Sequence, residues 1–102
     1  MRKQHDVVAR TPGELAGLLG LSDGAAQEWR LQSALLKRLK IVARRERLTH
    51  AEIAKRAGTS RTRVTAILND DLDHVSSDLL VRILASLGYR VRVSVVKPRV
   101  AA

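Results

Sequence analysis

The chain of 102 residues is long enough for one domain with a modest core, and its formal net charge is +9. It contains no cysteine, which excludes disulfides, thiol catalysis and cysteine-ligated zinc and fits a reducing cytoplasm. The basic excess makes nucleic acid the first expected partner, ahead of an anionic membrane surface or an acidic protein, and no apolar run approaches the roughly 20 residues of a membrane helix.

The N-terminal half is expected to contain two helices. Residues 1–10 are polar and basic, and we expect a flexible arm without the apolar core of a secretory signal. The Thr-Pro-Gly-Glu segment at 11–14 then predicts the start of a short helix over 12–19. A long helix is expected over about 24–47, because apolar residues recur there with helical spacing. Its inward stripe is predicted to consist of Trp29, Leu35, Leu36, Leu39, Val42 and Ala43.

The pattern of residues 49–69 predicts a helix-turn-helix. Thr49 and Glu52 have the spacing of a capping box at the start of a first helix. Gly58 is placed to end that helix, and Ser60 is placed to cap a second one. The second helix would present a polar outer face, which in this motif reads DNA, although an ordinary helical hairpin remains the alternative. The apolar residues expected to share one buried face are Ile53, Ala54, Ala57, Val64, Ile67 and Leu68.

The C-terminal part predicts one more helix and a strand. A polar loop at 69–74 and a Ser76 cap lead into a helix over 77–87, which Gly88 ends. The following alternation is typical of a half-buried strand over 89–96, whose apolar face would consist of Tyr89, Val91, Val93 and Val95.

This strand predicts a dimer. A lone strand cannot satisfy its own backbone groups, so we expect it to pair with the same strand of a second subunit about a two-fold axis. Such a homodimer would present two recognition helices to successive major grooves, about 34 Å apart. The expected fold is mainly α: a repressor-like helix-turn-helix bundle of about five helices with one C-terminal β-strand pairing across the homodimer. Residues 11–97 would form this single domain, and residues 98–102 a tail.

The motif resembles a known family. Residues 48–68 are similar to the Cro and phage-repressor type of helix-turn-helix, the XRE family. The wider stretch 11–96 resembles HigA-type antitoxins, which order a long helix, the reader motif, a Ser-capped helix and a C-terminal strand. The matching segments are Arg63-Val64, Ser76-Ser77-Asp78-Leu79 and Val91-Arg92-Val93.

The resemblance implies a function. It implies a repressor that binds a palindromic operator in double-stranded DNA, in a bacterial cytoplasm. An antitoxin of this kind would also bind a toxin protein, usually a basic ribosome-dependent RNase, and would regulate its own operon. Solitary regulators share the same pattern, and a net charge of +9 favours a solitary regulator because it opposes binding of a basic toxin.

The resemblance also places DNA contacts on this chain. Arg61 lies in the first turn of the second motif helix, where its guanidinium can bind guanine O6 and N7. Arg63 is expected to contact either a base or a phosphate. Relatives carry Gly-Lys after the recognition helix, but this chain has Asp70-Asp71, whose carboxylates would repel a phosphate backbone. The implied base contacts are Arg61, Thr62, Thr65 and Ala66. The implied phosphate contacts are His50, Ser60, Arg63 and Asn69.

No catalytic site is expected. His5, His50 and His74 are scattered without metal-ligand spacing, and the sequence lacks a nucleophile elbow, a phosphate loop and paired carboxylates. We therefore expect no enzyme, no metal and no cofactor. Trp29 and Tyr89 are the only aromatic residues, which disfavours modules that stack bases. The alternative function is a non-specific basic nucleic-acid-binding protein, architectural or ribosome-associated.

Overall fold

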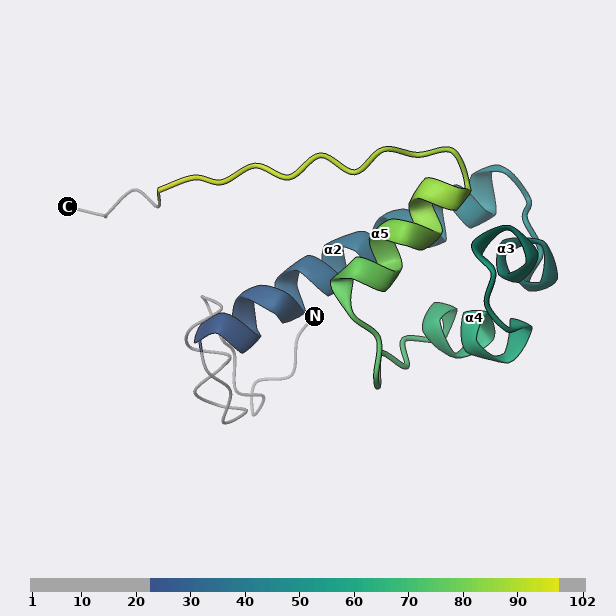
Figure 1. The fold of residues 1–102 in the computed structure, drawn as a ribbon, viewed down its shortest axis with the longest axis horizontal. Coiled ribbons are helices and arrows are strands. Elements are labelled where there is room, and N and C mark those ends of the chain that lie inside the picture. The colour runs from purple at the N-terminus through teal and green to yellow at the C-terminus, as the bar shows by residue number, and fades with distance from the viewer. Residues whose placement is uncertain (1–22, 98–102) are drawn as a thin grey trace, which may run out of the picture.

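The computed structural model describes residues 23–97, and Figure 1 shows that part as a small helical bundle. Its α2 and α5 pack along each other, while α3 and α4 pack together on one side of that pair (Figure 1). The arm expected at 1–10, the helix expected at 12–19 and the tail at 98–102 lie outside the described residues. The helices in the described range are α2 (Asp23–Arg45), α3 (His50–Ala57), α4 (Arg61–Leu68) and α5 (Ser77–Ser86).

The longest helix, α2, is unbroken over 23 residues and ends two residues before the predicted limit. Its end is set by Arg47, which adopts the left-handed conformation with φ 53°. The backbone N–H of Leu48 then donates to the carbonyl of Ala43 at 2.9 Å, which satisfies a carbonyl that the helix would otherwise leave unpaired.

The helix-turn-helix begins and ends at the residues that the sequence predicts. In the capping box, the N–H of Glu52 donates to the Thr49 hydroxyl at 3.0 Å, and the N–H of Thr49 donates to the Glu52 carboxylate at 2.7 Å. Gly58 ends α3 in the left-handed conformation, φ 69°. The hydroxyls of Ser60 and Ser76 accept N–H groups at the starts of α4 and α5. The caps predicted at Thr49, Gly58, Ser60 and Ser76 are confirmed. The last helix ends at Ser86, one residue before the predicted limit, and Gly88 follows it with a positive φ of 94°.

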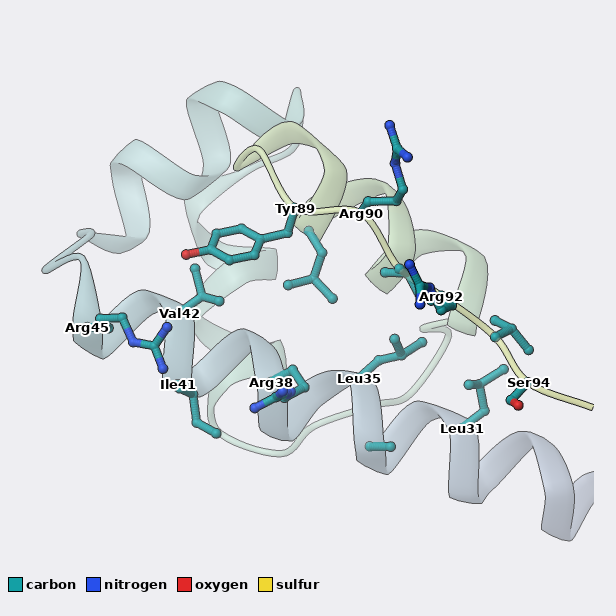
Figure 2. A pocket seen from close by; sticks show the side chains of 14 residues that line it. Leu31, Leu35, Arg38, Ile41, Val42, Arg45, Tyr89, Arg90, Arg92 and Ser94 are labelled. Atoms are coloured by element: carbon teal, nitrogen blue, oxygen red, sulfur yellow. The ribbon is translucent and has the colours of Figure 1, made fainter.

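The strand predicted over 89–96 is not present in the described chain. Residues 89–97 leave α5 without regular secondary structure and run back over the α2–α5 pair (Figures 1 and 2). Tyr89 and Val91 pack against the core, whereas Val95 is 94% exposed. A strand requires a neighbouring strand, and residues 23–97 offer none. The pairing across a homodimer therefore stays a prediction.

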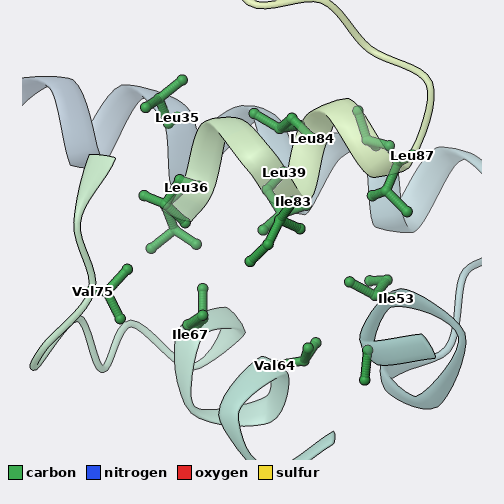
Figure 3. Close-up of a cluster of buried hydrophobic side chains, with 13 residues drawn as sticks. Leu35, Leu36, Leu39, Ile53, Val64, Ile67, Val75, Ile83, Leu84 and Leu87 are labelled. Atoms are coloured by element: carbon green, nitrogen blue, oxygen red, sulfur yellow. The ribbon is translucent and has the colours of Figure 1, made fainter. Parts of the chain in front are cut away.

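One apolar core unites the four helices of the described chain. Figure 3 shows Leu39 and Ile83, from α2 and α5, facing the side chains of Ile53, Val64 and Ile67 from α3 and α4. These residues are at most 1% exposed, which confirms the inward face predicted for the helix-turn-helix. Leu80 and Val75 extend the same cluster. Because all four helices contribute to this core, α4 has no separate core of its own.

Candidate nucleic-acid interface

The outer face of α4 carries the residues that the sequence assigns to base reading. Arg61 and Thr62, in the first turn, are exposed, and Arg61 forms no ion pair with residues 23–97. Thr65 and Ala66 are half-buried instead of fully outward. Ser60 uses its hydroxyl to cap the helix, accepting the N–H of Arg63 at 3.0 Å. The first turn is therefore the part of α4 with side chains free to reach a base edge.

Two residues that the sequence predicts to contact DNA form a hydrogen bond with each other. His50 is the first residue of α3, and its Nδ1 lies 2.7 Å from the Thr65 hydroxyl on α4. The sequence assigned these residues separately, His50 to a phosphate and Thr65 to a base. The bond ties the two helices of the motif together. It also fixes the Thr65 hydroxyl, whose freedom to bond a base depends on which imidazole nitrogen carries the proton.

Arg63 is turned toward the loop that follows α4. Its Nη2 donates to the carbonyl of His74 at 2.7 Å, and the side chain is half-buried. This bond leaves other guanidinium N–H groups for a phosphate, but it holds one end of the side chain at the loop. The sequence offered no signal for it, because residues 63 and 74 are joined only by the fold of the loop.

The two acidic residues after Asn69 are held within the chain. The Oδ1 of Asp70 lies 2.6 Å from the Lys40 Nζ on α2, and Asp71 accepts the N–H of Asp73 at 3.2 Å. The left-handed backbone of Asp70, φ 70°, turns the chain out of α4 and allows that approach. Asn69 itself is exposed, and its N–H closes the last turn of the helix. The ion pair compensates one of the charges that would repel a DNA backbone.

Further cations lie beside His50. Lys40 and Arg44 line a shallow hollow with His50, Leu48 and Leu68, next to the N-terminus of α3. A helix N-terminus carries partial positive charge, and Arg44 adds to it, whereas the charge of Lys40 is already paired with Asp70. The sequence contained a signal for this pair, since residues four apart on a helix share a face.

The capping box changes the titration of one group in this region. The pKa of Glu52 is lowered, chiefly because its carboxylate accepts the backbone N–H of Thr49 in the capping box.

Within residues 23–97, no group of three histidine, cysteine, aspartate or glutamate side chains is placed to hold a metal ion. In the same range, no helix has the length and apolar character required to span a membrane.

Comparison with known proteins gives one match. A family model described as a helix-turn-helix domain matches residues 19–96, a range that includes all four described helices. No curated protein and no solved structure matches the chain.

Proposed function

This chain belongs to the helix-turn-helix domain family, and from that premise we propose that it is a sequence-specific transcriptional regulator that represses a gene by binding double-stranded DNA. The observation that carries the proposal is the division of α4 into two faces. Val64 and Ile67 are buried, while Arg61 and Thr62 are exposed in the first turn. An arginine and a threonine at this place can contact guanine and thymine in the major groove.

The surface next to α4 suits the phosphate backbone. Lys40, Arg44 and His50 lie together at the start of α3, close to the outer face of the motif. Phosphate contacts fix the register of a DNA-binding protein, whereas base contacts choose the sequence. We assign His50 and Arg44 to phosphates, together with Asn69 at the end of α4.

We extend this proposal to a homodimer that binds a palindromic operator. Residues 90–96 form no backbone hydrogen bond within the described chain, so their N–H and C=O groups are open to a second strand. Pairing the segments of two subunits about a two-fold axis would satisfy these groups and present two α4 helices to one face of DNA.

Membership of the XRE class and an antitoxin role also belong to the proposal. The prediction that Trp29 lies on the inward stripe of α2 is wrong: its side chain is 43% exposed and outside the core, which suits a protein contact. If the chain is an antitoxin, a toxin would bind on the N-terminal part of α2. Co-expression tests this role: the chain should relieve growth inhibition by a toxin encoded beside it, and Trp29→Ala should weaken the relief while leaving DNA binding intact.

Selection of bound duplexes from a random DNA pool tests the central proposal. We expect enrichment of a palindrome whose half-sites lie about one helical turn apart. The double variant Arg61→Ala, Thr62→Ala should lose the enrichment while keeping its fold, because both side chains are outside the core. The matched control is Arg30→Ala, which removes the same charge from an exposed position of α2.

The alternative is a basic protein that binds nucleic acid without sequence preference. Binding at low salt without any enriched sequence would support it, because counterion release stabilises specific and non-specific complexes alike. Retained binding by the Arg61, Thr62 double variant would point in the same direction.

A further inference from the structure

A groove of about 540 Å³ lies between α2 and residues 89–97, here called the C-terminal segment. Figure 2 shows the side chains that line it. Its apolar part comes from both sides. Leu31, Leu35 and Ile41 project from α2, and Val91 and Val93 come from the C-terminal segment. Val93 is 65% exposed, so part of this surface is uncovered in the described chain. Apolar surface of this kind, collected in a concave site, favours a partner with apolar side chains.

The charged part of the groove is entirely cationic. Arg38 and Arg45 stand on α2, and Arg90 and Arg92 stand on the C-terminal segment; the side chain of Arg90 points away from α2 (Figure 2). All four are exposed, and none forms an ion pair with residues 23–97. No aspartate or glutamate lines the groove. The nearby carboxylate of Glu46 already accepts the hydroxyl of Tyr89.

DNA bound by α4 does not explain these arginines. The C-terminal segment crosses the α2–α5 pair on the side opposite α4, as Figures 1 and 3 both show. A duplex lying on the outer face of α4 would therefore be separated from the groove by the core of the protein. The charge on this side of the molecule is therefore available to another partner.

The chemistry of the groove distinguishes among partners. A nucleic-acid backbone would satisfy the guanidinium groups but would leave the apolar floor uncovered. A second copy of this chain, with its net charge of +9, would bring further arginines to the site. An acidic segment with apolar residues at alternate positions would satisfy both parts. The unpaired backbone groups of residues 90–96 favour an extended conformation for that segment, which could add to the edge as a strand.

We propose that this groove is the docking site for an acidic, amphipathic segment of another protein. Its carboxylates would pair with Arg38, Arg45 and Arg92, and its apolar side chains would cover the floor between α2 and the C-terminal segment. Residues 90–96 are extended and therefore have two backbone edges. The docked segment would use the edge facing α2, and the proposed homodimer would use the opposite edge. A basic toxin would be repelled here, and its contact would lie elsewhere.

Fluorescence anisotropy with synthetic peptides tests the proposal on the full chain. The probe is a labelled peptide that alternates glutamate with leucine or valine; the comparison peptide carries lysine in place of every glutamate. We expect the acidic peptide to bind and the lysine peptide not to bind. The double variant Arg38→Glu, Arg92→Glu should weaken binding by at least about tenfold. The matched control Arg30→Glu, Lys37→Glu changes the net charge equally at exposed positions outside the groove and should keep its affinity within about twofold.

Three outcomes would overturn the proposal. Equal loss of affinity in both double variants would mean that the overall charge, and not the groove, attracts the peptide. Equal binding of poly-glutamate, which has no apolar side chains, would remove the role of the floor. Displacement of the peptide by random-sequence RNA, together with loss of RNA binding in Arg38→Glu, Arg92→Glu, would make the groove a nucleic-acid site. Binding of a selected operator by the same variants reports on α4 separately, so failure here is distinct from failure of the proposed function.

Discussion

The carboxylate of Glu28 on α2 accepts both the backbone N–H of Ser77, at 3.0 Å, and its hydroxyl, at 3.2 Å. Ser77 is the first residue of α5, so a negative charge lies at the N-terminus of that helix, where it is stabilising. Gln32 supports the arrangement by donating to Glu28 at 3.1 Å and to the carbonyl of Val75 at 2.8 Å. These bonds join the N-terminal half of α2 to the loop that follows the reading helix.

Replacing Glu28 should therefore destabilise the fold. In Glu28→Ala the N–H and hydroxyl of Ser77 lose a charged acceptor, and we expect the free energy of unfolding to fall by about 1–3 kcal/mol. Urea denaturation followed by circular dichroism measures the change. Gln27→Ala, at the exposed neighbouring position, is the control and should leave stability nearly unchanged. Equal stability of the two variants would show that solvent replaces the carboxylate without cost.

Arg61→Ala should weaken DNA binding and relax sequence choice at one base pair. Loss of a bidentate guanine contact costs about 1–3 kcal/mol of binding free energy. Binding to a selected operator and to its single-base variants measures both effects. Arg63→Ala is the comparison: because Arg63 bonds the His74 carbonyl, we expect it to lower stability more than sequence preference. A uniform loss across all operator variants would make Arg61 a phosphate contact.

Gly58→Ala should cost about 1–2 kcal/mol of folding free energy, because alanine is strained in the left-handed conformation that Gly58 adopts at φ 69°. A Cβ at this position would meet no atom within 4 Å, so steric overlap adds nothing to the cost. Thermal denaturation measures it. Asparagine tolerates the left-handed region better, so Gly58→Asn should be milder. The backbone explanation fails if the two variants lose the same stability.

Tyr89 should titrate above its usual range. Its pKa is raised, chiefly because the phenol donates to the Glu46 carboxylate, so the protonated form is favoured in the folded state. The stability from this bond is fully present below the unfolded pKa, near 10, and is lost as pH rises through the higher folded value. The chain has one tyrosine, so tyrosinate absorbance reports this group alone. Glu46→Gln should lower the measured pKa toward 10; an unchanged value would contradict the assignment.

Local chemistry made the helix-turn-helix predictable. The residues that begin and end α3 and α4 act on their immediate neighbours: Thr49 and Ser60 accept N–H groups three residues ahead, and Gly58 supplies its own conformation. Helical spacing in turn identified the buried faces, including Val64 and Ile67. Such signals need no knowledge of the rest of the fold.

Contacts between distant segments were not predictable in this way. Asp70 pairs with Lys40, and Glu28 binds Ser77, only because the folded chain brings α2 beside the residues that follow α4. The alternation at 89–96 indicates an extended segment, but whether it becomes a strand depends on a neighbouring strand, which a single sequence does not supply. For the same reason, the sequence assigned Thr65 to an open reading face without its bond to His50.

The buried and exposed faces of α4 have separate roles. Val64 and Ile67 are buried in the shared core, while Arg61 and Thr62 are exposed and are not part of it. If the proposed function holds, substitutions at these two exposed positions should alter which DNA sequence is bound at little cost in stability. Thr65 is the exception, since a change there also removes a bond to α3. For a DNA-binding protein of the proposed kind, the first turn of α4 is then the place where sequence preference could change while the fold is kept.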